Sequence, residues 1–455
     1  MNPERLTLSA WIFLSVCLIT IVDAFMPQMV FKLVSAGLIV VYLILQIRKI
    51  PIKQEFAGLI LILIGSLAAW QSGIWLNTLI DGLARSRIFL LLFFAVAWLQ
   101  FPVGDSPTLK SVREAILHQP PGRRFLVLSF GMHMLGAILN VAAVGLLSPI
   151  LKARSDPLLQ RRLSLAVMHG FTSASAWSPF YIGMIVVLVA IPNLSWLDVA
   201  LQGMALAPIM ILGGWLFDRL RYRRKRSADN TVTSQPKPEV RIGKTALLLM
   251  SLILLVFATF KFAEVNVAVA LGMVCPPYAL IWYVTQGERQ ANKVERFATL
   301  CFRVVTGLPS LRNETLMFVA ANVFGIGIAS AIPAENLADL LDLYVPVIDF
   351  RIVVLATLFL GCGFIGLHPV VVVLTLGAIL TPEIMGLRDW VLGLVFLGCW
   401  GLSTMVSPYS GTTLFMSRFT GTPAHIIGWQ WASYSVLFNA ALMIAFIIAL
   451  RHVTL

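Results

Sequence analysis

Two long apolar stretches of this chain are each interrupted near the centre by a short polar motif, SAWSPF at residues 175–180 and TMVSPY at residues 404–409. Each motif contains a Ser-Pro step, at Pro179 and at Pro408. Proline lacks a backbone N–H and clashes with the preceding turn, so each step is expected to break a helix and to free backbone carbonyl groups. One such motif is as easily a simple kink as a binding element. Two copies at matching positions favour a pair of broken helices that share one site.

The chain around these motifs has the composition of a membrane protein. Of its 455 residues, 59% are hydrophobic and 12% are charged, which is more apolar surface than a water-soluble fold can bury. Roughly 20 apolar residues cross the hydrocarbon core as a helix, and about eleven stretches satisfy this requirement. We expect spanning helices at residues 7–25, 28–46, 55–73, 87–103, 160–191, 197–217, 243–260, 265–285, 314–332, 388–415 and 426–450.

Two further apolar segments, 124–151 and 350–381, contain glycine, proline and polar residues at their centres. We interpret them as re-entrant hairpins, because non-helical backbone at membrane depth is tolerated only where it is buried in protein or lines a cavity. Asn140 is the one strongly polar side chain at the first tip, and His368 occupies the corresponding place in the second, beside Pro369. A polar group at such a position is costly in lipid, which favours a functional role for both residues.

The distribution of positive charge predicts the orientation. If the N-terminus is cytoplasmic, the short loops on that side hold about 27 of the 34 Lys and Arg residues, as the positive-inside rule requires. This count holds only if both irregular segments are hairpins, the first opening to the cytoplasm and the second to the outside. Asp23 and Lys32 then lie near the outer interface, where we interpret them as snorkelling side chains.

The elements fall into two halves of similar order, which predicts an all-α polytopic membrane protein of inverted repeats. We expect an N-terminal transmembrane helix at 1–27, a first repeat at 28–217, a basic cytoplasmic linker at 218–242 and a second repeat at 243–455. The broken helices at 160–191 and 388–415 belong to one repeat each. Semi-polar helices at 105–123 and 289–311 are expected at the membrane surface, as arms that hold a moving unit.

The sequence ILNVAA at residues 138–143 resembles the Ser-Asn-Thr hairpin of the divalent anion/sodium symporter family, which is part of the larger ion transporter superfamily. The two Ser-Pro steps look like the Thr-Pro-Pro steps of that family, and His368 with Pro369 falls where the second Ser-Asn-Thr motif would be. The resemblance implies an elevator-type carrier, in which hairpin tips and broken helices bind substrate and coupling ion together. Neither hairpin keeps the family's hydroxyl residues, so the resemblance does not imply a dicarboxylate substrate.

These patterns predict a secondary active transporter of a small organic anion in a bacterial inner membrane. No Asp or Glu lies near either tip in the sequence, which disfavours a bare cation, and helix N-termini favour an anion. The predicted coupling residue is His368, because an imidazole with an ordinary pKa of about 6.5 changes charge near neutral pH. The expected substrate-binding residues are Asn140, Ser175, Ser178, Thr404, Ser407 and Thr412.

Several alternatives stay open. The coupling ion is H⁺ at His368 or Na⁺ held by carbonyls freed at Pro179 and Pro408. A cation/proton or metalloid antiporter of the same superfamily is the second hypothesis, and a membrane-embedded glycan- or lipid-modifying enzyme is the third, disfavoured by short outer loops without histidine. We expect no resident cofactor, no metal site and no nucleic-acid partner. The expected partners are the lipid bilayer and a small-molecule solute, with a homodimer as one form of assembly.

Overall fold

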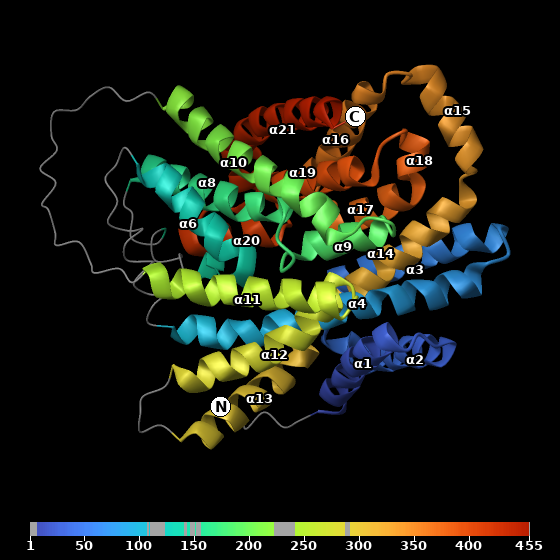
Figure 1. Ribbon diagram of the computed structural model, residues 1–455. Helices are drawn as coiled ribbons and strands as arrows, with labels where there is room; N and C mark the ends of the chain where they lie inside the picture. Colours follow the sequence, from blue (N-terminus) through green and yellow to red (C-terminus); the bar gives the residue numbers. More distant parts are fainter. Residues whose placement is uncertain are drawn as a thin grey trace, which may run out of the picture.

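The computed structural model in Figure 1 describes residues 7–106, 109, 123–140, 143–145, 151, 156–222, 242–286 and 292–454. Throughout these residues the regular structure is helical. Nine of the described helices are long and apolar enough to cross a membrane, and a bent pair with an angle of 110° makes a tenth candidate. The chain is therefore a multi-pass membrane protein. The sequence predicted about eleven spans.

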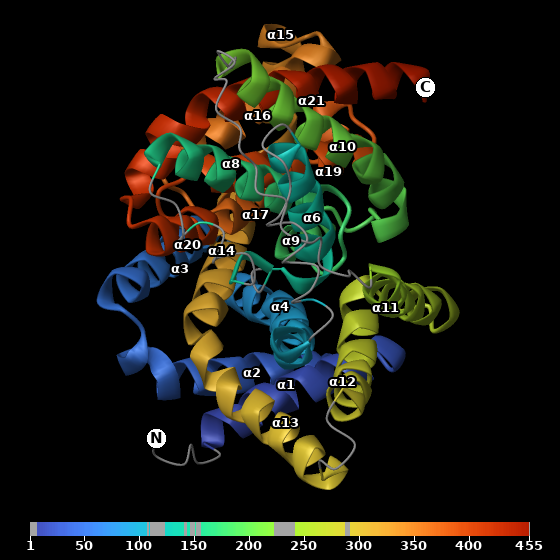
Figure 2. The ribbon, with the colours of Figure 1, turned by 90° about the vertical axis from the view of Figure 1, so that its left-hand side faces the viewer.

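The helices form two groups, which Figure 2 shows one above the other. The lower group, called here the frame helices, comprises α1 (Leu8–Phe25), α2 (Met29–Gln46), α3 (Ile52–Gln71), α4 (Trp75–Asp105), α11 (Ile242–Phe262), α12 (Val267–Thr285), α13 (Lys293–Gly307) and α14 (Arg312–Ala331). The upper group, called here the hairpin helices, comprises α6 (Arg124–Leu139), α8 (Pro157–Ser173), α9 (Ile182–Ala190), α10 (Trp196–Arg221), α16 (Ile348–Phe364), α17 (Pro369–Ile379), α19 (Asp389–Val406), α20 (Gly411–Thr420) and α21 (Ser433–Val453). The two groups meet chiefly where α14 packs on α17 and where α4 packs on α6 and α9.

The frame is held together by an unusually close crossing of α3 and α14. A Cβ atom added at Gly327 would lie 2.0 Å from the backbone oxygen of Gly65, and one added at Gly65 would lie 2.6 Å from the Cα of Phe324. Small residues let two helix backbones approach in lipid, where packing rather than the hydrophobic effect drives association. Glycine is therefore required at both positions for the frame to close.

We expect Gly327→Ala to destabilise the protein by about 3 kcal/mol, because the added methyl group overlaps backbone that cannot move aside. Gly37→Ala is the matched control, since a Cβ atom on this α2 residue meets nothing within 4 Å. The midpoint of thermal unfolding in detergent should fall for Gly327→Ala and stay level or rise for Gly37→Ala. Equal midpoints for the two variants would contradict the crossing.

Each hairpin enters and leaves at one end of the molecule. After the first hairpin, Gln160 Nε2 donates to the backbone oxygen of Leu151 at 3.1 Å, and Arg124 and Asp156 line the same surface cavity. The start of α6 and the chain that follows the hairpin are therefore neighbours. Residues 141–142, 146–150 and 152–155 lie outside the described residues.

The second hairpin has the same geometry. It consists of α16 and α17, which are joined by a short non-helical tip, and it leads into the short helix α18 (Pro382–Met385). Arg351 near the start of α16 donates from Nη1 to the backbone oxygen of Ile384 at 3.4 Å. The chain thus returns to the end at which it entered.

Both Ser-Pro steps interrupt a helix. In the first half, α8 and a 3₁₀ turn (Ala174–Ala176) end before Pro179, and α9 begins at Ile182. In the second half, α19 ends at Val406 and α20 begins at Gly411, with Pro408 between them. The two long helices expected at 160–191 and 388–415 are therefore each two half-helices around a break.

Two links between helix ends agree with the predicted sidedness. Arg312 Nε donates to the backbone oxygen of Lys49 at 3.0 Å, and with a cytoplasmic N-terminus the predicted spans place both loops, 47–54 and 285–313, in the cytoplasm. Ser72 Oγ donates to the backbone oxygen of Ser330 at 2.8 Å, and both were predicted at the outer face. The absolute orientation of the N-terminus stays a prediction.

Within 289–311 the structure has the helix α13, which leads into the spanning helix α14, in the order that the sequence predicted. The element directly before the second hairpin is α15 (Ala334–Tyr344), where the sequence analysis placed nothing. Its acidic residues and its length of 11 residues made it look like a loop. Most of the helix expected at 105–123 and of the linker expected at 218–242 lies outside the described residues.

Candidate functional site

A cavity of about 500 Å³ lies where both hairpin tips, both helix breaks and the frame helices α4, α13 and α14 meet. Four of the predicted site residues line it: Asn140 and His368 at the hairpin tips, and Thr404 and Thr412 on either side of the second break. These residues are up to 272 positions apart in the sequence, and the fold brings them to one space. We call this space the central cavity.

Asn140 ends α6 in a conformation that side chains rarely adopt. Its backbone φ is 51° and its ψ is −134°, a region that glycine favours. Its side chain is 6% exposed, and Nδ2 donates to the backbone oxygen of Phe180 at 3.2 Å, across the first helix break. Such strain costs of order 1–3 kcal/mol and persists where surrounding contacts impose it, often at functional sites.

Ser178 does not line the central cavity. Its hydroxyl donates to the backbone oxygen of Ala137 on α6 and accepts from the N–H of Phe180 at 3.2 Å. These bonds, together with that of Asn140, fasten the first hairpin tip to the first break. The position of Ser178 therefore suits a structural role.

Ser175 also lies away from the cavity, between the two broken helices. Its hydroxyl is 2.7 Å from the backbone oxygen of Thr172 and 2.9 Å from that of Leu397 on α19, and it donates its single proton between them. Gly401 on α19 packs against Thr172 so closely that a Cβ atom there would lie 2.6 Å from the Thr172 oxygen. Ser175 thus holds the two broken helices together.

The carbonyl groups freed at the breaks have partners within the protein. At the first break, Trp196 Nε1 donates to the backbone oxygen of Trp177 at 2.9 Å. At the second, Thr413 Oγ1 donates to the backbone oxygen of Ser407 at 2.6 Å, and the predicted site residue Ser407 ends α19 through its backbone N–H, which donates to the backbone oxygen of Ser403 at 2.9 Å. Neither Pro179 nor Pro408 lines the cavity. Because protein donors already satisfy these oxygens, they are poor candidates for a cation site.

His368 is the N-cap of α17 and faces the central cavity. The N–H of Val370 donates to His368 Nδ1 at 3.3 Å, which assigns the proton of the neutral imidazole to Nε2. The side chain is exposed to the cavity. His368 can therefore present one N–H donor to a bound solute without losing its capping bond.

Two charged residues of the frame line the same cavity and were missed by the sequence analysis. Arg303 lies on α13, 5.9 Å from the ring of Phe101, and Glu314 lies on the first turn of α14. The expectation that no carboxylate lies near the tips is wrong, because Glu314 is distant only in sequence. The amphipathic pattern of 293–307 was the available signal, and it was assigned to the membrane surface.

Three helices begin at the central cavity. Ile182 of α9, Pro369 of α17 and Gly411 of α20 are the first residues of their helices, and all three line it. The first N–H groups of a helix lack partners within it, and its dipole gives that end a partial positive charge. Together with Arg303, these helix ends supply positive charge to the cavity wall, and Glu314 and the C-terminal ends of α6 and α13 supply negative charge.

No family model matches the chain, and no curated protein matches it. Two solved structures match the chain at low sequence identity. The Alcanivorax borkumensis YdaH transporter is 13% identical, with a TM-score of 0.47 over 82% of this chain and 88% of that one. Neisseria gonorrhoeae MtrF, described with a class of antimetabolite efflux pumps, is 11% identical, with a TM-score of 0.47 over 78% of this chain and 80% of that one. Likeness at this level assigns neither family nor function, and the relation to the divalent anion/sodium symporter family stays a prediction.

Proposed function

We propose that this chain is a secondary active transporter of a small organic anion in a bacterial inner membrane, with its N-terminus in the cytoplasm. The observation that supports this proposal is the central cavity, which both hairpin tips, the breaks and the frame helices line together. Binding elements at the interface of two helix groups suit alternating access, in which one group moves against the other around a bound solute.

The charges of the central cavity favour an anion. Arg303 supplies a full positive charge, and the N-terminal ends of α9, α17 and α20 supply partial ones. Asn140, His368 and Thr412 add side chains that can donate hydrogen bonds, as a carboxylate or similar group requires. Glu314 and the C-terminal ends of α6 and α13 offset part of this positive charge, and the hydrogen-bond donors at the hairpin tips and the second break then favour an anion.

The contact between the two helix groups suits an elevator-type movement. A Cβ atom added at Gly325 of α14 would lie 2.6 Å from the backbone oxygen of Leu374 of α17, so backbone meets backbone there. Glycine at this crossing leaves no side chain of α14 between the two backbones at that point. We propose that α17 slides along α14 as the hairpin helices move.

We expect Arg303→Gln to raise the KM for the transported anion at least tenfold, because a charge-assisted hydrogen bond is worth about 1.5–3 kcal/mol. Lys293→Gln is the matched control, since Lys293 is an exposed cation at the start of the same helix and does not line the cavity. The measurement is uptake of radiolabelled mono- and dicarboxylates into proteoliposomes, with the internal solute identified by chromatography.

Two outcomes of the same assay would contradict the proposed transporter, and a third would contradict only the role of Arg303. No accumulation of any carboxylate under sodium or proton gradients would reject an organic-anion carrier. Conversion of the solute to another compound would support the membrane enzyme instead. Equal KM values for Arg303→Gln and Lys293→Gln would remove Arg303 from the site.

The presence of Glu314 in the central cavity is the one observation that favours the second hypothesis, a cation/proton antiporter. A carboxylate can bind a cation and can also take up a proton. In that case Glu314→Gln would abolish transport, and Arg303→Gln would speed it by removing a repelling charge. An anion carrier should show the reverse order of sensitivity.

A further inference from the structure

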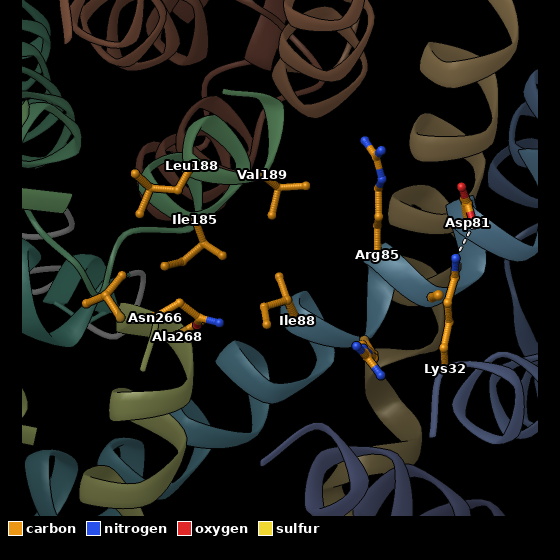
Figure 3. Close-up of a pocket in the computed structure, with 12 residues that line it drawn as sticks. Lys32, Asp81, Arg85, Ile88, Ile185, Leu188, Val189, Asn266 and Ala268 are labelled. Atoms are coloured by element: carbon orange, nitrogen blue, oxygen red, sulfur yellow. Dashed lines mark ion pairs between the residues drawn. The ribbon is translucent and has the colours of Figure 1, made fainter. Parts of the chain in front are cut away.

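A second cavity, of about 390 Å³, lies between α4, α9 and the start of α12, and Figure 3 shows it in close-up. One wall carries the cations Lys32, Arg85 and Arg87 from α2 and α4. The opposite wall is apolar and belongs to α9. The sequence places most Lys and Arg residues at the other face of the membrane, so three cations in one cavity at this face are a notable concentration.

The charges of this cavity do not cancel. Lys32 Nζ lies 2.6 Å from Asp81 Oδ1, and Arg87 forms an ion pair with Asp23 on α1. Lys32 and Asp23 therefore each belong to an ion pair, Lys32 with Asp81 and Asp23 with Arg87. The sequence analysis had interpreted both as snorkelling side chains. Arg85 is exposed, and it has no ion pair with any acidic residue that the structure describes. Figure 3 shows its guanidinium pointing away from the pair of Lys32 and Asp81.

The apolar wall faces these charges. One side of the cavity is formed by the α9 residues Ile185, Leu188 and Val189, and Arg85 lies on the opposite side (Figure 3). Asn266 closes a third side at the N-terminus of α12, where its Oδ1 accepts from the N–H of Val269 at 3.0 Å. An uncompensated guanidinium opposite an aliphatic wall matches an organic anion that has one charged group and an apolar body.

The second cavity and the central cavity are neighbours along the same two helices. On α9, Ile182 borders the central cavity and Ile185 borders the second one. On α4, Phe93 borders the central cavity and Ile88 the second one. At 1.5 Å per residue, these steps correspond to about 5 Å along α9 and about 8 Å along α4. A shift of α9 along α4 by one to two helical turns therefore spans the distance between the cavities.

We propose that the second cavity is an anion-binding site in which Arg85 holds the charged group of the transported organic anion at the opposite face from Arg303. This inference rests on the proposed function for the identity of the anion, but not for the existence of the site. Arg303 and Arg85 are then two anion-binding positions on the frame helices, called here the two stations. The hairpin helices carry the anion from one to the other. The residue at each station sets the apparent affinity at its own face.

The binding site is tested by protection from thiol labelling. Val189→Cys, in a chain whose five native cysteines are replaced by alanine, places a reporter on the apolar wall. The probe is 2-naphthoate, and 2-naphthamide is its uncharged partner of the same shape. We expect 2-naphthoate to slow labelling by N-ethylmaleimide at least threefold, 2-naphthamide to have no such effect, and Arg85→Gln to abolish the protection.

Lys261→Gln is the control, since Lys261 is an exposed cation at the end of α11 that does not line the cavity. Protection should persist in this variant. Equal protection by acid and amide, or protection that survives Arg85→Gln, would overturn the site. If the cysteine-free chain does not fold, hydrogen exchange of α4 and α9 in the native chain gives the same answer, with slower exchange in 2-naphthoate expected only while Arg85 is present.

Transport assays separate this inference from the proposed function. In proteoliposomes sorted by orientation, Arg85→Gln should raise the KM at least tenfold for anion added at the face of the second cavity and leave the opposite KM within twofold. Loss of affinity at both faces would overturn the two-station arrangement. Naphthoate protection without transport of any carboxylate would refute the transporter and leave the binding site intact.

Discussion

Replacing Asn140 by glycine is expected to reduce transport at least tenfold while changing the free energy of unfolding by no more than about 1 kcal/mol. Glycine adopts the φ of 51° without strain, which recovers of order 1–3 kcal/mol. The loss of the hydrogen bond to Phe180 leaves a buried oxygen unpaired at a similar cost. The two terms offset each other in stability, whereas the amide that faces the central cavity is lost outright.

Glu264→Gly is the matched control. Glu264 is the other described non-glycine residue with a positive φ, at 53°, and it lies exposed between α11 and α12. Glycine there should raise the midpoint of thermal unfolding and leave transport unchanged. The measurements are thermal unfolding in detergent and uptake into proteoliposomes. Normal transport by Asn140→Gly would show that the strained tip does not contact the solute.

The signals that pointed to the hairpin tips and to the helix breaks were local in the sequence. Pro179 and Pro408 lie at helix breaks, whereas Pro102, Pro208, Pro276 and Pro277 lie inside continuous helices. Proline therefore marks a break here only together with the polar motif around it. Asn140 and His368 stand out because each is a lone polar group at the centre of an apolar segment. Such features need no knowledge of which helices become neighbours.

Whether a serine side chain of these motifs faces the central cavity could not be predicted from the sequence in the same way. Ser178 and Ser407 occupy equivalent places in the two motifs, yet neither lines the cavity. The Ser178 hydroxyl donates to the backbone of α6, and the bond that Ser407 accepts from Thr413 goes to its backbone oxygen. A hydroxyl group at a helix break can cap backbone or face a ligand, and the sequence does not distinguish these roles. Only the packing of neighbouring helices decides between them.

Local sequence patterns could not predict the contacts between the two helix groups. Arg303 and Glu314 line the central cavity because α13 and α14 pack near hairpins that lie far away in the sequence. Arg85 has no local feature that separates it from Arg87, although Arg87 forms an ion pair and Arg85 forms none with the acidic residues in the described part of the chain. Long-range pairing of helices determined the site chemistry in each case.

His368 can couple transport to protons only if binding of the solute changes the protonation state that the His368 imidazole prefers. In the empty site, Nδ1 accepts from Val370, so a proton added there removes a capping bond and puts a positive charge at the positive end of α17. Both effects favour the neutral imidazole. An anion held by Nε2–H favours the imidazolium instead, so that anion and proton bind cooperatively, which is symport.

Uptake by the wild type is therefore expected to become tighter as the pH falls. Because the site without anion favours the neutral imidazole, the KM for the anion should continue to decrease at pH values below the ordinary imidazole pKa of about 6.5. His368→Gln keeps a polar side chain but cannot titrate, so its KM should be independent of pH. His368→Asn is the matched control for the cap, because asparagine is among the best N-cap residues and should preserve α17 while also removing the titration. If accumulation driven by a pH gradient survives in both variants, His368 does not carry the proton. Uptake that needs a sodium gradient and ignores pH in the wild type would reassign His368 to a structural donor at the hairpin tip.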